Sequence, residues 1–279
     1  MADASRLLAF PLMASLALSA LTSSPRVAAQ APVSSFHWPE GYRAAVSLSF
    51  DDARESQLDV GAPVLAETRT KVTFYLTAGN LGNRADDWKK AAAAGHELGN
   101  HSMVHPCSGN FGWSRTHALE DMSLDRMRQE LTEANRAIEA ATGVRPVTFA
   151  YPCGQTFVGR GRGVQSYVPL ISELFLSGRL WLSEAPNDPG YADLAQLTGY
   201  PMDDVEFDEL EPVIRNAVDR GQWLVLAGHD IGSTPGKQVT RVSMLRALTR
   251  YLQQRDRLVW VDTVGAVAAH VQRSRPHVP

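Results

Sequence analysis

Short apolar runs alternate with helix-patterned segments along nearly the whole chain, and this alternation limits the folds that it can adopt. We expect strands at 44–50, 71–76, 96–100, 147–150, 180–182, 222–227 and 258–261. The segments between them predict helices at 58–68, 87–94, 123–142, 168–176, 210–220, 239–254 and 263–271. Such alternation favours a largely parallel sheet flanked by helices, either a barrel or a doubly wound sheet.

The composition indicates one ordinary globular domain. The 279 residues carry 27 lysines and arginines against 30 aspartates and glutamates, and 44% are hydrophobic. Without a basic excess, nothing points to nucleic acid as a partner. An α/β barrel commonly needs about 200 to 250 residues, and no linker divides the chain, so we expect a single domain over 32–279.

The first 31 residues differ from the rest and predict an export signal. Arg6 precedes an uncharged apolar run at 7–18, and small residues follow up to Ala29 and Ala31, either of which can precede a cleavage site. The run is shorter than the roughly 20 residues that span a bilayer, and no later stretch is apolar enough to do so. We expect a cleaved signal peptide at 1–31, a secreted or periplasmic protein, and no integral membrane segment in the mature chain. An uncleaved anchor is the alternative.

Polar side chains follow several of the predicted strands, where catalytic groups of α/β barrels gather. Asp51 and Asp52 come directly after the first strand. Two adjacent carboxylates repel each other unless a cation or hydrogen bonds offset the repulsion. The alternative is a helix N-cap followed by a solvent-facing acid.

Three histidines stand in comparable places. His101 and His105 are four residues apart after the third strand, and His229 follows the very apolar strand 222–227. Together with an aspartate, the first two make a set of two histidines and one carboxylate, which leaves metal positions open for water and substrate. Each histidine taken singly is more simply a surface residue. The other five histidines have no comparable context: His37, His96, His117, His270 and His277.

Only two cysteines are present, Cys107 and Cys153. In an oxidising compartment an isolated pair is a disulfide candidate, and two separate buried thiols are the alternative.

Residues 43–265 resemble the polysaccharide deacetylases, the NodB-homology group known as carbohydrate esterase family 4. Ser49-Phe50-Asp51-Asp52 is similar to the family's Thr-Phe-Asp-Asp motif, and 101–106 (His-Ser-Met-Val-His-Pro) matches its His-Ser/Thr-x-x-His-Pro motif. The stretch 224–229 is similar to its closing Leu-x-Leu-x-x-His motif. The resemblance implies a distorted (β/α)₇ barrel as the fold.

The resemblance also implies roles for these residues. Asp52, His101 and His105 would hold zinc or another divalent transition metal. Asp51 would be the base that takes a proton from the metal-bound water, and His229 would be the acid that protonates the leaving group. The backbone N–H of Cys153 would help to bind the oxyanion. Tyr151 and Leu226, with Leu224, are further candidates for contact with the substrate.

One motif departs from the family pattern. Where the family has Arg-x-Pro-Tyr-Gly, 150–154 reads Ala-Tyr-Pro-Cys-Gly. Ala150 removes the arginine that orients the base, so we expect Asp51 to lack its usual cationic partner. The motif also implies that a Cys107–Cys153 disulfide would join two loops at the site. The acid that orients His229 is not determined by pattern, and Asp188 and Asp204 are candidates.

The function that the resemblance implies is hydrolysis of acetyl groups, foremost N-acetyl groups, on a poly- or oligosaccharide. An O-acetyl esterase acting on xylan is an alternative that the same site can perform. A metal-free amidohydrolase of small cyclic amides is a third possibility, against which the aspartate and two histidines stand. The missing arginine favours a fourth, a glycan-binding pseudoenzyme that retains the metal.

Overall fold

A computed structural model describes residues 36–254 and 258–275. The expected signal peptide at 1–31 lies outside these residues, so its cleavage stays a prediction. Among the helices in the described part, none is long and apolar enough to cross a membrane.

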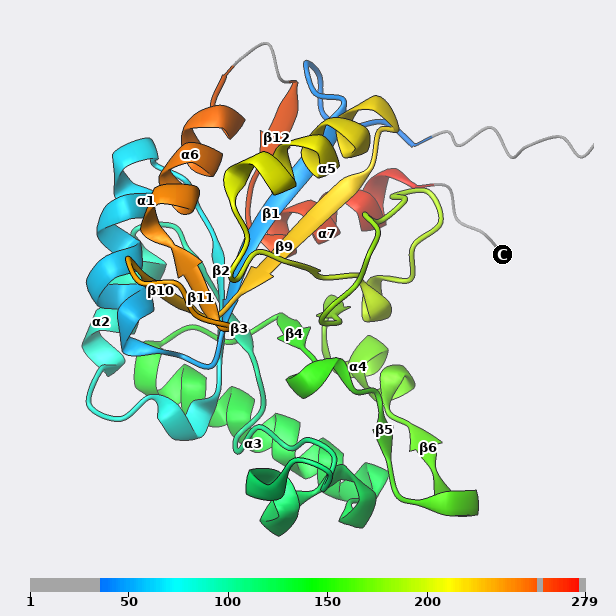
Figure 1. Cartoon of the computed structure of the whole chain (residues 1–279). Coiled ribbons are helices and arrows are strands. Elements are labelled where there is room, and N and C mark those ends of the chain that lie inside the picture. Colours follow the sequence, from blue (N-terminus) through cyan, green and yellow to red (C-terminus); the bar gives the residue numbers. More distant parts are fainter. Residues whose placement is uncertain (1–35, 255–257, 276–279) are drawn as a thin grey trace, which may run out of the picture. The chain divides into compact units, whose positions relative to one another are not determined.

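The described residues build one parallel sheet around a central strand, β1 (Ala44–Asp51). Its order is β7-β4-β3-β2-β1-β9-β8, and β12 pairs with the first half of β1 beside β2. In Figure 1, β1 and β9 run side by side and point the same way. The other strands of this sheet are β2 (Thr73–Leu76), β3 (Glu97–Asn100), β4 (Thr148–Ala150), β7 (Ser177–Arg179), β8 (Tyr200–Pro201), β9 (Trp223–Gly228) and β12 (Val259–Val261).

The two edges of this sheet meet through Leu197. The Leu197 N–H donates to the Gly178 carbonyl at 2.8 Å, and the Leu180 N–H donates to the Leu197 carbonyl at 2.7 Å. The chain then enters β8, which pairs with β9. The strands β1, β2, β3, β4, β7, β8 and β9 therefore close into a distorted parallel barrel, which confirms the expected (β/α)₇ fold.

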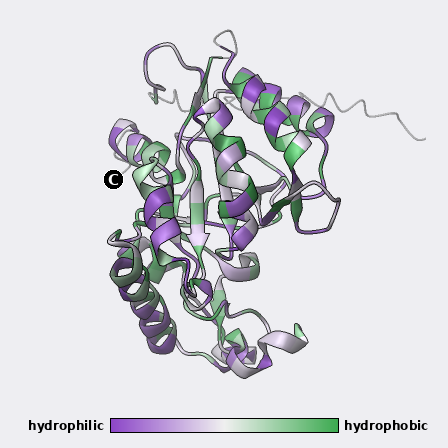
Figure 2. Cartoon of the chain, turned by 90° about the vertical axis from the view of Figure 1, so that its left-hand side faces the viewer, coloured by the Kyte–Doolittle hydropathy of each residue, from purple (hydrophilic) through white to green (hydrophobic). Residues whose placement is uncertain are grey.

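Helices cover the outside of the barrel. They are α1 (Ala62–Thr68), α2 (Ala85–Ala93), α3 (Leu124–Thr142), α4 (Val168–Leu174), α5 (Phe207–Asp219), α6 (Val242–Leu252) and α7 (Val264–Ser274). Figure 2 shows purple and green bands along the helices, as expected where one face packs on the sheet and the other meets solvent. Successive side chains along a strand point to opposite faces of the sheet. In β1, Val46, Leu48 and Phe50 therefore pack in the cluster beneath the helices, whereas Asp51 belongs to the other face.

Two strands differ from the sequence prediction. The strand expected at 180–182 lies at Ser177–Arg179 instead. The buried Arg179 interrupts the apolar pattern by which a strand is recognised in the sequence. The two-residue β8 was not predicted, since so short a run carries no periodicity. Two small pairs lie outside the barrel: β5 (Phe157–Val158) with β6 (Gln165–Ser166), and β10 (Asp230–Gly232) with β11 (Val239–Arg241).

Candidate active site

The carboxyl ends of the barrel strands open onto a cleft of about 1150 Å³. Because the strands are parallel, the residues that follow them meet at one rim. The cleft walls include most of the residues expected from the sequence: Asp51, Asp52, His101, His105, Tyr151, Cys153 and His229. The fold thus gathers segments up to 178 residues apart into one site.

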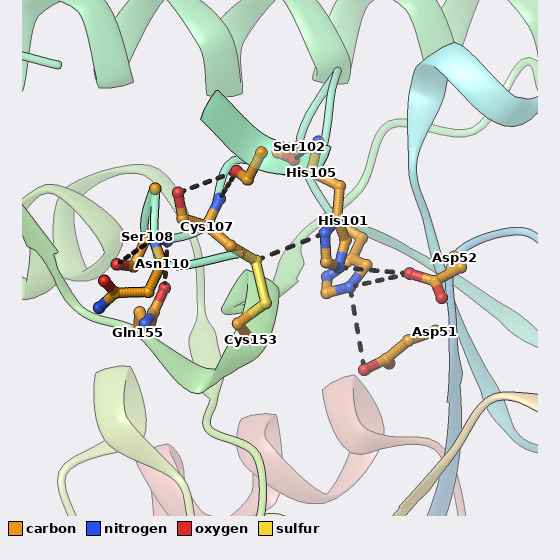
Figure 3. The surroundings of a disulfide bond; sticks show 12 residues. Asp51, Asp52, His101, Ser102, His105, Cys107, Ser108, Asn110, Cys153 and Gln155 are labelled. Carbon is orange, nitrogen blue, oxygen red and sulfur yellow. Dashed lines mark hydrogen bonds and ion pairs between the residues drawn. A yellow bond between two sulfur atoms is a disulfide. The ribbon is translucent and has the colours of Figure 1, made fainter. Parts of the chain in front are cut away.

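Three side chains are spaced as ligands of one metal ion. The Asp52 Oδ1 atom lies 3.4 Å from Nε2 of His101 and 3.4 Å from Nε2 of His105 (Figure 3). Ligand atoms bound tetrahedrally at about 2.0–2.1 Å would lie roughly 3.3 Å apart. The donor set and its spacing therefore fit zinc or a similar divalent transition metal.

Hydrogen bonds orient these ligands from behind. Nδ1 of His101 lies 2.9 Å from the Ala150 carbonyl oxygen, a contact that assigns the proton to Nδ1 and leaves Nε2 as the ligand atom. The His105 N–H donates to Ser102 Oγ at 2.9 Å. Burial, followed by repulsion from His101, lowers the pKa of His105 to about 4, so this imidazole is neutral and able to ligate at neutral pH.

Arg54 holds the second oxygen of Asp52. Its Nη2 and Nε atoms donate to Asp52 Oδ2 at 2.8 and 3.0 Å, which leaves Oδ1 facing the histidines. The same guanidinium contacts Asp230 at 2.5 Å and Gln238 at 2.8 Å. Burial raises the pKa of Asp52, but contact with the His101 imidazole and the nearby His105 and His229 outweigh it and bring the pKa far below its usual range. Arg54 was not singled out from the sequence, since a charged residue in a loop carries no pattern.

Asp51 has a cationic partner after all, contrary to the expectation drawn from Ala150. Nη2 of Arg179, at the end of β7, contacts Asp51 Oδ1, and both side chains are buried. Burial raises the pKa of Asp51, but Arg179, His101 and His229 outweigh it and hold the pKa below the ordinary value. An arginine from another strand thus takes the place that Ala150 leaves empty. The feature of the sequence that could have pointed to Arg179 is that it is a single arginine among apolar and small residues.

The acid that orients His229 is Asp203, and neither Asp188 nor Asp204 takes this role. Asp203 Oδ2 lies 2.6 Å from His229 Nδ1, while its Oδ1 accepts from the His229 N–H at 3.1 Å and from Thr240 Oγ1 at 2.7 Å. Burial lowers the pKa of His229, but the hydrogen bond to Asp203 and the charge of Asp51 raise it above its usual value. Asp188 instead accepts from the Gly190 N–H in a turn.

Cys107 and Cys153 are joined in a disulfide bond, which ties the loop after β3 to the loop after β4 (Figure 3). Cys107 Sγ lies 3.6 Å from His105 Nδ1. Asp52, Ser102, His105 and Cys153 all have positive φ. Non-glycine residues in this region cluster at functional sites, where the surrounding structure holds them.

The remaining candidates lie differently from expectation. Leu224 and Leu226 are fully buried in the cluster that includes Leu210 and Ile214 of α5, and they do not line the cleft. The alternation of β9 directs them toward the helices, so a role in an acetyl pocket does not follow from their position. Tyr151 lines the cleft, but its hydroxyl donates to the Ala195 carbonyl at 2.8 Å.

Comparisons with known proteins agree with this fold. Residues 40–159 match the family model described as polysaccharide deacetylase. A chitooligosaccharide deacetylase from Rhizobium leguminosarum bv. trifolii is 31% identical over 101 residues, which is 34% of this chain and 40% of that protein. A gellan lyase from a Bacillus species is 25% identical over 270 residues, 86% of this chain and 10% of the lyase. The chain thus spans less than half the length of these curated relatives.

Solved structures share the barrel at low sequence identity. A candidate polysaccharide deacetylase from Mycobacterium smegmatis has a TM-score of 0.61 at 19% identity, over 89% of this chain and 98% of that one. A family 4 pseudoenzyme from Bacillus anthracis has a TM-score of 0.51 at 21% identity, over 80% and 65%. The fold is therefore the barrel of the solved polysaccharide deacetylases. Residues 40–159 are similar to the polysaccharide deacetylase family, as the motifs in that part of the sequence indicated.

Proposed function

We propose that this protein is a metal-dependent hydrolase that removes acetyl groups, foremost N-acetyl groups, from a poly- or oligosaccharide. The observation that carries the proposal is the convergence of three sets of residues in one cleft. They are the ligand set Asp52, His101 and His105, the pair Asp51–Arg179 and the pair His229–Asp203. The pair Asp51–Arg179 removes the one feature that favoured a pseudoenzyme.

Asp52, His101 and His105 would hold a divalent transition metal. A metal bound there would polarise the acetyl carbonyl and lower the pKa of a water. Arg54 keeps one oxygen of Asp52 occupied, so that the other is directed at the histidines. The Ala150 carbonyl accepts a hydrogen bond from Nδ1 of His101, which fixes the orientation of the ring and leaves Nε2 as the ligand atom.

Asp51 would accept the proton of the attacking water. Arg179 neutralises the carboxylate in its buried position and fixes its orientation through Oδ1, while Oδ2 faces His101. A base that is held in one orientation needs little reorganisation when the proton moves.

His229 would donate a proton to the departing amine or alcohol. Asp203 accepts from Nδ1, so Nε2 is the atom that remains for the substrate. The raised pKa of His229 keeps more of the imidazole protonated near neutral pH, as an acid requires.

Acetate release from acetylated glycans tests the proposed function. We expect zinc-loaded protein to release acetate, chelation to abolish release and restored zinc to recover it. Asp51→Asn should lower kcat by about 10²- to 10⁴-fold while zinc content stays unchanged. Asp86→Asn on α2, whose side chain is 84% exposed, is the matched control and should behave as wild type. The panel includes N-acetyl chitooligosaccharides and O-acetyl xylan. Release that persists in Asp51→Asn or without metal would contradict the mechanism.

The pH profile tests the role of Asp203. Because the hydrogen bond to this carboxylate raises the pKa of His229, Asp203→Asn should lower that pKa. The acid form of His229 is then lost at lower pH, and the alkaline limb of the kcat profile should move toward lower pH. We also expect kcat to fall roughly tenfold or more. An alkaline limb that stays in place would show that His229 is not the titrating acid.

We also propose that the protein acts outside the cytoplasm. The Cys107–Cys153 disulfide supports this, because disulfides persist in oxidising compartments. The amino-terminal sequence of protein recovered from the producing cells tests it: an intact residue 1–31 segment in cytosolic protein would overturn it.

A further inference from the structure

Two large aromatic side chains face solvent beside the candidate metal site. Phe111 and Trp113 lie between β3 and α3 and are 43% and 57% exposed. Their rings are stacked, with centroids 5.6 Å apart and planes inclined by 30°. The Trp113 ring lies 5.7 Å from that of His105, and both aromatic residues line the same cleft as Asp51 and His229. Exposed aromatic pairs next to a cleft commonly mark binding sites.

The segment that carries these rings is braced from several sides. The Cys107 N–H donates to Ser114 Oγ at 2.9 Å, and that hydroxyl donates back to the Cys107 carbonyl. Glu120 accepts from Ser108 Oγ at 2.5 Å and from the Gly109 N–H at 2.9 Å.

Two further contacts attach this segment to the loop after β4. The Ser108 N–H donates to Gln155 Oε1 at 2.7 Å (Figure 3), and the disulfide joins Cys107 to Cys153. The backbone under the two rings is therefore held without any ligand. A surface that is organised in advance loses little conformational entropy when it binds.

The charged residues that line the cleft limit which ligands can bind there. Among the described residues that line it, Arg54 is the one lysine or arginine, and it is paired with Asp52 and Asp230. Asp51, Asp52 and Glu55 face the same space. An anionic ligand would find no free guanidinium or ammonium group there, whereas a neutral ring with an apolar face suits the aromatic pair.

We propose that Phe111 and Trp113 form a subsite for a pyranose ring of a neutral glycan, next to the acetylated sugar at the metal site. The apolar C–H face of a pyranose covers an aromatic ring well, and its equatorial hydroxyls remain at the edge. The inference rests on the proposed function and makes the substrate an oligo- or polysaccharide, not a single sugar.

Binding of N-acetylglucosamine and of its neutral β-1,4-linked tetramer to zinc-loaded protein, by calorimetry at low temperature, tests the subsite. We expect Trp113→Ala to weaken tetramer binding roughly tenfold, which corresponds to about 1.4 kcal/mol, because the aromatic contact with the sugar ring is lost. Monosaccharide binding should change less than about twofold, and Trp113→Phe should retain most of the tetramer affinity. Tyr191→Ala removes another exposed aromatic residue, one that does not line the cleft, and should bind as wild type.

The outcomes separate this proposal from the deacetylase function. Equal tetramer affinity in wild type and Trp113→Ala overturns the subsite, as does equal loss for tetramer and monosaccharide or no tetramer binding at all. Acetate release then still decides the deacetylase function by itself. Tetramer binding that depends on Trp113 without acetate release would support the subsite and contradict the deacetylase. Because Trp113 is largely exposed, thermal unfolding of Trp113→Ala should match wild type, and Trp113→Phe provides a second folded variant.

Discussion

Replacing Arg179 with methionine is expected to lower the free energy of unfolding by about 3–5 kcal/mol, because it leaves the buried Asp51 carboxylate without its counter-charge. The Arg179 side chain has no exposed surface, and that of Asp51 is 4% exposed. Acetate release should fall as well, by roughly 10²-fold or more, since Asp51 loses the group that orients it. Chemical denaturation and steady-state kinetics at fixed zinc measure the two effects.

Arg84→Met is the matched control for this experiment. Arg84 pairs with the carboxylates of Asp59 and Asp87, but near the surface at the start of α2. Surface ion pairs contribute little to stability, so this variant should unfold and turn over nearly as wild type. Equal effects of the two substitutions would contradict the assignment of Arg179 as the partner of the base.

Removing the disulfide with the double change Cys107→Ser and Cys153→Ser should lower the free energy of unfolding by about 4 kcal/mol. This figure follows from the loop-closure entropy of two residues separated by 46 positions. Measured losses for native disulfides are commonly about 2–5 kcal/mol. Equilibrium denaturation of the oxidised protein and the double variant under identical conditions gives the difference.

The effect of this double change should extend to the site, because the bond joins the loop of His105 to the loop of Cys153. We expect weaker zinc binding in the variant, measured by competition with a chromophoric chelator. Wild type reduced with a phosphine, which unlike a dithiol does not compete for zinc, is the control that keeps both cysteines. Unchanged stability and zinc affinity in both samples would show that the hydrogen bonds of Ser114 and Glu120 hold the loop without the disulfide.

Residues that lie close together in the sequence carried the predictions that the structure bears out. Asp51 and Asp52 follow an apolar strand, and His101 and His105 follow another. The parallel barrel then brings such strand ends to one rim, whatever the details of the loops. Local pattern therefore predicted a parallel sheet flanked by helices, the family resemblance narrowed this to a barrel, and the strand ends pointed to the residues that line the cleft. The helix at 123–142 was also predicted almost to its ends, since its apolar spacing and Gly143 are local signals.

Contacts between distant segments decided the rest. Arg179 reaches Asp51 across 128 positions, and Asp203 reaches His229 across 26, and neither pairing leaves a spacing that a pattern can detect. A one-residue difference in strand phase turns a side chain to the opposite face. For this reason Leu226, expected at the cleft, packs under the helices. Asp203, in the turn after β8, meets the histidine in place of Asp204. The sequence alone determined the fold class and the residues at the strand ends. Tertiary packing determined which of the charged side chains pair with each other, because a buried ion pair forms only where the fold brings two distant segments of the chain together.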